Sequence, residues 1–101
     1  MHVAAEGVWL DSYRIFETKQ FDEDLTAIAR SGRGQIVRKL QSIVYPQLRQ
    51  HPHFGGNIRK RKNYTPETWR YRIGAWRFFY EIDEDERIVL MIAASHRGST
   101  Y

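Results

Sequence analysis

The chain contains no cysteine, which excludes disulfide bonds, thiol catalysis and zinc sites built from cysteine. It also lacks any apolar run close to the roughly 18 residues that a membrane-spanning helix needs. The opening sequence, MHVAAEGVWLDSYR, has no apolar core followed by a cleavage site, as a signal peptide would have. We therefore expect a cytoplasmic protein that does not associate with a membrane.

Metal ligands are also scarce. His51 and His53 could supply two of them, but no carboxylate or thiol stands at a suitable spacing. No glycine-rich phosphate loop follows a predicted strand, so the use of a nucleoside triphosphate is not expected. The sequence therefore predicts no metal site and no cofactor.

Acidic residues are outnumbered by lysines and arginines, 12 against 16, and the net charge is +4. The basic residues concentrate between Arg59 and Arg77, a stretch in which Glu67 is the one acid. A basic block on a small domain is typical of proteins that bind polyanions. For the part that reads RKRK, residues 59–62, a merely solvated loop is the alternative.

The stretch WRYRIGAWRFFYEID, residues 69–83, predicts two strands joined by a two-residue loop at Gly74-Ala75. Strand alternation places Arg70 and Arg72 on one face of the first strand, and its aromatic residues on the other. Glycine in the first loop position fits a type II′ turn. The sequence therefore predicts a hairpin with one aromatic face and one arginine-bearing face.

In the register of that turn, Arg72 lies directly opposite Arg77, and Phe79 and Glu81 share their face. Like charges opposite each other destabilise a sheet by up to about 1 kcal/mol. We expect a bound anion to neutralise the pair. The alternative is that both guanidinium groups extend into water, with Glu81 reducing their repulsion.

At 101 residues the chain is long enough for one domain with a modest core. Residues 1–11 show little pattern and are expected to form a flexible leader before a single domain at residues 12–101. Residues 12–17 alternate and are rich in β-forming types, which predicts a strand. Thr18 then suits the N-cap of a helix that Ser31-Gly32 should end.

A second helical pattern starts near Arg33, and Pro46 should end or kink it close to Tyr45. Residues 50–66 predict a loop, and residues 87–94 are apolar on both faces, as an interior strand would be. The order strand–helix–helix–strand–strand–strand predicts an α+β fold. Two N-terminal antiparallel helices would pack on one face of a mostly antiparallel sheet of about four strands. The arginine-bearing face would lie on the uncovered side.

The segment from Trp69 to the end of the chain resembles the C-terminal half of the RelE/ParE superfamily of bacterial toxins. That pattern is an aromatic-Arg-x-Arg strand, a glycine turn, an aromatic-Arg-x-x-Tyr strand and a closing His-Arg-x-x-x-Tyr. The closing elements correspond here to His96, Arg97 and Tyr101. The upstream YRIFETKQFDEDL is similar to the opening strand and first helix of the superfamily. The resemblance covers residues 13–101 and implies a RelE-like fold.

The resemblance implies the toxin of a type II toxin–antitoxin system, with a cognate antitoxin as partner. Members similar to RelE cleave messenger RNA in the ribosomal A site, whereas members similar to ParE poison DNA gyrase. The intact His-Arg-x-x-x-Tyr ending favours a ribosome-dependent, metal-independent endoribonuclease that uses the ribose 2′-hydroxyl as nucleophile. A ParE-like gyrase inhibitor that acts by binding, or a non-catalytic relative that binds an antitoxin, remains the alternative.

Arginine binds phosphate oxygens in pairs and keeps its charge, so we expect Arg77 to stabilise the transition-state phosphate with Arg72 beside it. His96, whose type has an ordinary pKa near ~6.5, and Tyr101 are the candidates for proton transfer. An ordinary surface histidine and a frayed terminal residue are their alternative interpretations. The residues expected to bind RNA or phosphate are Arg59, Lys60, Arg61, Lys62, Arg70 and Arg97.

The sequence differs from the RelE pattern on the first strand of the hairpin. Lysines that serve there in proton transfer are replaced by Arg70 and Arg72. Arginine is a poor base because its pKa lies above ~12. This difference shifts the expected role of general base to His96 or Tyr101.

Overall fold

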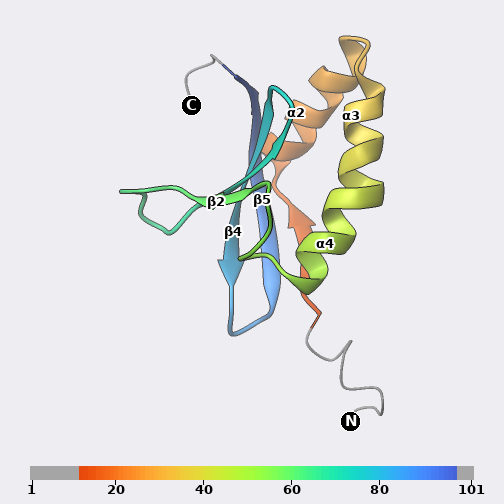
Figure 1. Cartoon of the computed structure of the whole chain (residues 1–101). Helices are drawn as coiled ribbons and strands as arrows, with labels where there is room; N and C mark the ends of the chain where they lie inside the picture. Colours follow the sequence, from red (N-terminus) through yellow and green to blue (C-terminus); the bar gives the residue numbers. More distant parts are fainter. Residues whose placement is uncertain (1–11, 98–101) are drawn as a thin grey trace, which may run out of the picture.

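The computed structural model describes residues 12–97 of the chain. The expected leader, residues 1–11, and Tyr101 lie outside the described residues. A five-stranded sheet with the order β1-β5-β4-β3-β2 has helices packed on one face (Figure 1). β1 (Arg14–Glu17) runs parallel to β5 (Ile88–His96), and the other neighbouring strands are antiparallel. The expected α+β layers are confirmed, while the strand count corrects the expected four.

The predicted hairpin consists of β3 (Trp69–Ile73) and β4 (Trp76–Asp83). Its register is as expected, because Arg72 lies opposite Arg77. Gly74 has a φ angle of 56°, the left-handed conformation that the first loop residue of a type II′ turn requires. Local turn chemistry therefore sets which side chains of the two strands share a face.

The additional strand, β2 (Ile58–Lys60), lies within the segment that was expected to be a loop. It pairs with β3, with Ile58 opposite Tyr71 and Arg59 opposite Arg70. Ile58 is buried in the core and so anchors the strand. A strand of three residues is too short for its alternation to be recognised in the sequence. It forms here because the edge of β3 offers backbone groups for pairing.

The first helix, α2 (Lys19–Arg30), begins where predicted, because the Thr18 hydroxyl accepts a hydrogen bond from the Phe21 N–H at 3.1 Å. It ends before Gly32, which has a φ angle of 87°. Its buried stripe consists of Phe21, Leu25 and Ile28. This stripe packs α2 against the sheet.

The second helical segment does not end near Tyr45. It comprises α3 (Gly34–Lys39), a π-helical turn η1 (Leu40–Val44) and α4 (Tyr45–Gln50). Pro46 cannot donate a backbone hydrogen bond and would clash with the preceding turn of an α-helix. The wide π turn stands directly before it, so the helix changes type at the proline and then continues.

The core lies between the helices and the sheet. Its fully buried members come from both layers, and the largest of them are Tyr80, Phe21, Phe78, Leu40, Leu48, Met91, Val44 and Val89. Trp69 and Trp76, on the aromatic face of the hairpin, are only half-buried and pack against the edge of the core. None of the helices in residues 12–97 is long and apolar enough to span a lipid bilayer.

Candidate functional site

The sheet face opposite the helices, called the open face below, carries four arginines on three adjacent strands. Arg59 on β2 lies opposite Arg70 on β3, and Arg72 on β3 lies opposite Arg77 on β4. Strand alternation directs their side chains away from the core, since their chain neighbours Ile58, Tyr71 and Phe78 are buried on the helix side. These four residues are called the arginine face.

The four guanidinium groups lack acidic partners: within residues 12–97, none of them forms an ion pair. Two of them instead donate to nearby backbone, Arg72 Nε to the Gly74 carbonyl at 3.0 Å and Arg59 Nη1 to the Ile58 carbonyl at 2.9 Å. Repulsion between like charges across both strand pairs is therefore uncompensated by carboxylates in this part of the chain. An anion placed over the face would remove that repulsion.

Two polar atoms of the arginine face are buried without a hydrogen-bond partner in the described part of the chain. They are Nε of Arg70 and Nη1 of Arg77. Buried donors are normally satisfied, and leaving one unpaired costs about 1–3 kcal/mol. Burial lowers the pKa of Arg70 from its ordinary value, and the neighbouring guanidinium group of Arg77 lowers it further. Both observations indicate a site that gains from a bound oxyanion.

A hollow of about 350 Å³ opens between β2 and the hairpin turn. Its lining consists of three of the arginines and the segments beside them: Gly56, Asn57, Arg59, Arg70, Arg72 and Gly74. Asn57 was missed at the sequence level. Its carbonyl accepts the Arg72 N–H at 3.0 Å, so it holds β2 against β3. The sequence could point to Asn57 only if the short strand that follows it, β2, were recognised first.

The four residues of RKRK differ in their contacts within the protein. Arg59 belongs to the arginine face, whereas Lys60 forms an ion pair with Glu67 at 2.7 Å. The side chain of Arg61 lies over the aromatic ring of Phe79, and Lys62 is exposed. Alternation along β2 separates Arg59 and Arg61 from Lys60, so two of the four cations face the open side together.

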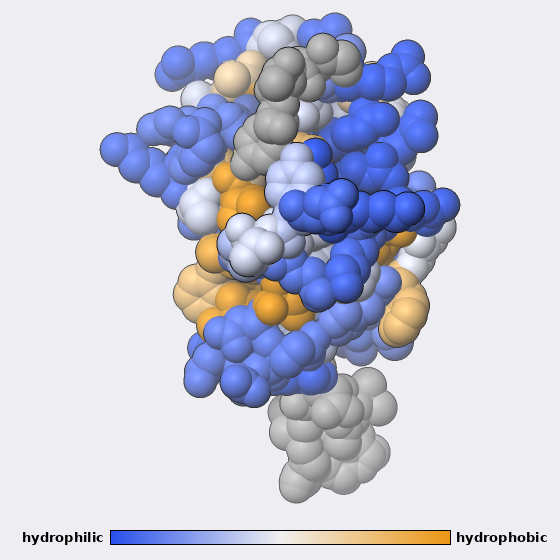
Figure 2. All heavy atoms as spheres, turned by 90° about the vertical axis from the view of Figure 1, so that its left-hand side faces the viewer, coloured by the Kyte–Doolittle hydropathy of each residue, from blue (hydrophilic) through white to orange (hydrophobic). Residues whose placement is uncertain are grey.

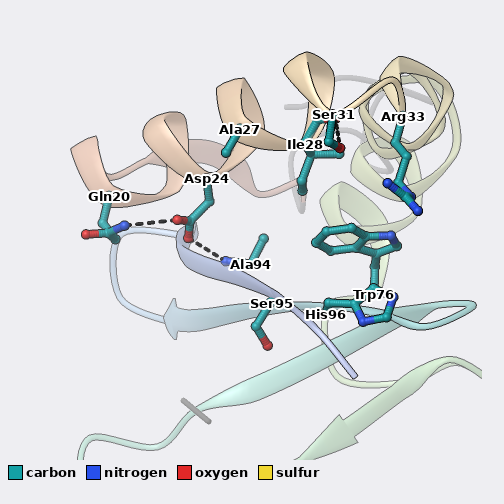
Figure 3. A pocket seen from close by; sticks show the side chains of 10 residues that line it. All are labelled: Gln20, Asp24, Ala27, Ile28, Ser31, Arg33, Trp76, Ala94, Ser95 and His96. Atoms are coloured by element: carbon teal, nitrogen blue, oxygen red, sulfur yellow. Dashed lines mark hydrogen bonds between the residues drawn. The ribbon is translucent and has the colours of Figure 1, made fainter. Parts of the chain in front are cut away.

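His96 does not share a sheet face with the arginines. It lies opposite Trp76 in the β4–β5 register, and the two rings meet edge to face with centroids 4.9 Å apart. Residues directly opposite in a sheet point to the same side, so His96 faces the helices while Arg77 faces the open side. It lines a pocket of about 630 Å³ beneath α2, beside Trp76 and Arg33 (Figure 3).

Of the remaining expected site residues, Arg97 lies near the hairpin turn and Tyr101 lies outside the described residues. The backbone N–H of Arg97 donates to the Ala75 carbonyl at 2.5 Å, which places this exposed residue next to the hairpin turn. The structure thus brings together Arg59, Arg70, Arg72 and Arg77. It sets His96 on the other face, and says nothing of Tyr101, which is not among the described residues.

One of the two histidines weighed as metal ligands, His53, contacts a carboxylate of the protein. His53 Nε2 contacts Oε2 of Glu84 at 2.5 Å, and the other oxygen of that carboxylate accepts a hydrogen bond from the Tyr13 hydroxyl at 2.7 Å. This network links the loop after α4 to the turn between β4 and β5. Its geometry accounts for His53 through contacts within the protein.

Comparison with known families supplies the identification. A family model for the ParE toxin of the type II toxin–antitoxin system parDE matches residues 15–101. The chain belongs to this family. The resemblance to the RelE/ParE superfamily seen in the sequence is thereby confirmed, and this ParE-family protein is a toxin of a toxin–antitoxin system. No curated protein matches its sequence.

Solved structures of related toxins share the fold of this ParE-family chain. The toxin–antitoxin complex RelBE2 from Mycobacterium tuberculosis is 20% identical, covering 85% of this chain and 99% of that chain with a TM-score of 0.64. The RelE–RelB complex from Pyrococcus horikoshii OT3 is 16% identical, covering 88% of this chain and 99% of that chain with a TM-score of 0.65. The YoeB dimer from Staphylococcus aureus is 15% identical, covering 85% of this chain and 98% of that chain with a TM-score of 0.67. At these identities the likeness establishes the fold alone.

Proposed function

We propose that this toxin is an endoribonuclease that cleaves ribosome-bound messenger RNA and binds the RNA backbone on its arginine face. The observation that carries the proposal is the cluster of four guanidinium groups without acidic partners in residues 12–97. Two buried nitrogen atoms in it have no described hydrogen-bond partner. A phosphodiester supplies both the negative charge and the acceptor oxygens that these groups lack.

In the proposed reaction, the ribose 2′-oxygen attacks the adjacent phosphorus as the bond from phosphorus to the 5′-oxygen breaks. The products are a 2′,3′-cyclic phosphate and a free 5′-hydroxyl. Negative charge grows on the non-bridging oxygens in the transition state, where Arg77 and Arg72 would donate charge-assisted hydrogen bonds. Arg70 and Arg59 would hold the flanking backbone in register.

Proton transfer needs a group other than arginine, whose pKa is too high for a base. His96 and Tyr101 are our candidates, and the position of His96 on the helix side of the sheet requires the RNA to pass around the end of β5 to reach it. The ribosome would position the message, and correct positioning alone contributes greatly to such reactions.

Cleavage of a message on translating ribosomes tests this function. We expect Arg77→Ala to lower the cleavage rate by about 10²–10³, the typical effect of removing one donor to a developing oxyanion. The matched control is Arg38→Ala, which removes an exposed arginine from the helix side of the molecule. Message ends mapped at fixed times give the rate.

A single His96→Ala variant separates proton transfer from binding. If His96 transfers a proton, the rate falls by about 10²–10⁴ while the affinity for RNA stays within a factor of two. Wild-type rates in both Arg77→Ala and His96→Ala would mean that the residues named here do not perform the reaction. Absence of cleavage by the wild-type protein would reject the endoribonuclease function.

The second candidate function is inhibition of DNA gyrase by binding alone, with no bond cleaved by the toxin. Two observations favour it: the family model that matches is the ParE toxin, and the histidine stands on a different sheet face from the arginines. The arginine face would then contact DNA or an acidic protein surface. In a supercoiling assay, a gyrase inhibitor blocks the enzyme at stoichiometric toxin, whereas an endoribonuclease leaves supercoiling unchanged.

An antitoxin partner is proposed under either function. Two similar structures are toxin–antitoxin complexes. We infer that the antitoxin carries acidic residues that cover the arginine face, because no acid of residues 12–97 pairs with it. Co-purification with the product of the adjacent reading frame should be lost in Arg70→Glu if this contact exists, and retained in Arg38→Ala.

A further inference from the structure

The loop between β2 and β3, residues 61–68, stands out from the side of the sheet away from the helices (Figure 1). It carries Tyr64, an aromatic residue that is 41% exposed. A single exposed aromatic residue is common on protein surfaces and means little by itself. The contacts beneath Tyr64 set it apart.

The guanidinium carbon of Arg61 lies 3.9 Å from the centroid of the Tyr64 ring and 4.6 Å from that of Phe79. Phe79 is the inner member, since only 3% of it is exposed and it stands on the open face of β4. Phe79, Arg61 and Tyr64 therefore form a stack that rises from the sheet, called the aromatic–arginine stack below. Tyr64 is its outermost group.

Arg61 is held in this position by a backbone hydrogen bond and by its contacts with the two rings. Its Nη1 atom is buried and has no hydrogen-bond partner among residues 12–97, and its backbone N–H donates to the Thr68 carbonyl at 2.8 Å. A cation over an aromatic ring is attracted by the negative ring face, more strongly when water is excluded. The contact restrains the tyrosine ring before any ligand arrives, which reduces the entropy lost on binding.

The stack adjoins the arginine face. Phe79 lies directly opposite Arg70 in the β3–β4 register, and side chains at such positions are near neighbours. A hollow of about 720 Å³ is lined by the loop around Tyr64, and the exposed Lys62 contributes to it. The acid of this region, Glu67, is paired with Lys60 at 2.7 Å, which offsets its repulsion of a nearby phosphate.

We propose that Tyr64 is a stacking site for an unpaired base of RNA whose backbone lies on the arginine face. The inference rests on the RNA-binding function proposed above and assigns to it a residue that contacts a base. Every base has a flat face, so stacking suits a single strand of mixed sequence. A message held this way would have one base fixed beside the phosphate that the arginines contact.

Binding to two single-stranded probes of equal length tests the proposal. Both carry 2′-O-methyl groups, which prevent cleavage, and one of them is abasic throughout. We expect Tyr64→Leu to weaken binding of the base-bearing probe roughly 5- to 150-fold, the range that stacking of one base supplies. Binding of the abasic probe should change less than twofold. Tyr64→Phe, which keeps the ring, should bind both probes like the wild type.

Arg70→Ala is the matched control, because loss of a phosphate contact should weaken both probes alike. Equal losses for both probes in Tyr64→Leu would overturn the stacking role, since they would indicate a disturbed loop or backbone contact. Unchanged binding of both probes in Tyr64→Leu would overturn it as well. Wild-type protein that binds neither probe would reject the RNA-binding function, and this inference with it. Thermal unfolding of each variant establishes that it is folded.

Discussion

The open face of the sheet has two regions that share one pleated geometry and differ in chemistry. Near the hairpin turn lies the arginine face. Toward the opposite ends of β1, β4 and β5 lies an apolar region made of Phe16, Ile88 and Leu90. Its charged neighbours are the acids Glu81 and Asp83 and one cation, Arg14, which lies opposite Ile88 and over the ring of Phe16. Figure 2, which views this side, shows hydrophilic atoms over much of the surface and apolar atoms gathered mainly in its lower part.

The difference shows that alternation decides only which way a side chain points. The charges at the outward positions decide what can bind there. A polyanion gains from the arginine face, because it offsets repulsion within the two arginine pairs. The apolar region offers the same polyanion one cation, Arg14, against two acids, so it does not attract the polyanion on balance. A bound RNA strand should therefore be confined to one end of the open face.

Introducing a glutamate at one position in each region tests that confinement most strongly. We expect Arg70→Glu to weaken binding of single-stranded RNA roughly 10- to 150-fold, as expected for loss of a hydrogen bond to a charged group worth about 1.5–3 kcal/mol. Leu90→Glu places the same side chain on the apolar region and should change affinity less than twofold. Fluorescence anisotropy with a labelled probe measures both. Similar losses in the two variants would mean that RNA spans the whole face.

The salt dependence of binding counts the phosphate contacts. Each arginine removed from the arginine face should reduce the slope of log affinity against log salt concentration by about 0.7 for a single strand. Arg59→Ala and Arg72→Ala, made singly and together, should thus show additive reductions. Phe16→Thr, on the apolar region, should leave the slope unchanged. If neither Arg59→Ala nor Arg72→Ala changed the salt-dependence slope, the RNA backbone would lie away from these two arginines.

The smallest effect is expected in the stability of the free protein. Arg72→Thr removes the like-charge pair with Arg77 and introduces a β-branched residue, so it should raise the free energy of unfolding by up to about 1 kcal/mol. Arg72→Lys, which keeps the charge, should not. Urea unfolding at low salt provides the measurement. A destabilised Arg72→Thr protein would show that the guanidinium groups do not repel each other in the native state.

Local rules were sufficient for several elements. The Thr18 cap begins α2, Gly74 sets the hairpin turn, and the pairing of Arg72 with Arg77 follows from that turn. Each of these depends on contacts between residues close in sequence. Local rules left open whether Pro46 ends or kinks the second helix, and the structure shows that the helical segment changes type there and continues to Gln50.

The site was predictable in part. Alternation alone assigns Arg70, Arg72 and Arg77 to one face of the hairpin. The addition of Arg59 and Asn57 depends on β2, a strand that forms only because the edge of β3 is available to it. The stack on Tyr64 likewise depends on Arg61 reaching a ring that is distant in sequence.

The sequence by itself determined the helix starts, the hairpin register and the concentration of positive charge, since these depend on neighbouring residues and on composition. Only the tertiary structure decided which charges meet. The pairing of β5 with β4 turned His96 toward the helices, opposite Trp76 and away from Arg77. A register between distant segments is set by burial of the whole sheet, and no local pattern of residues reports it.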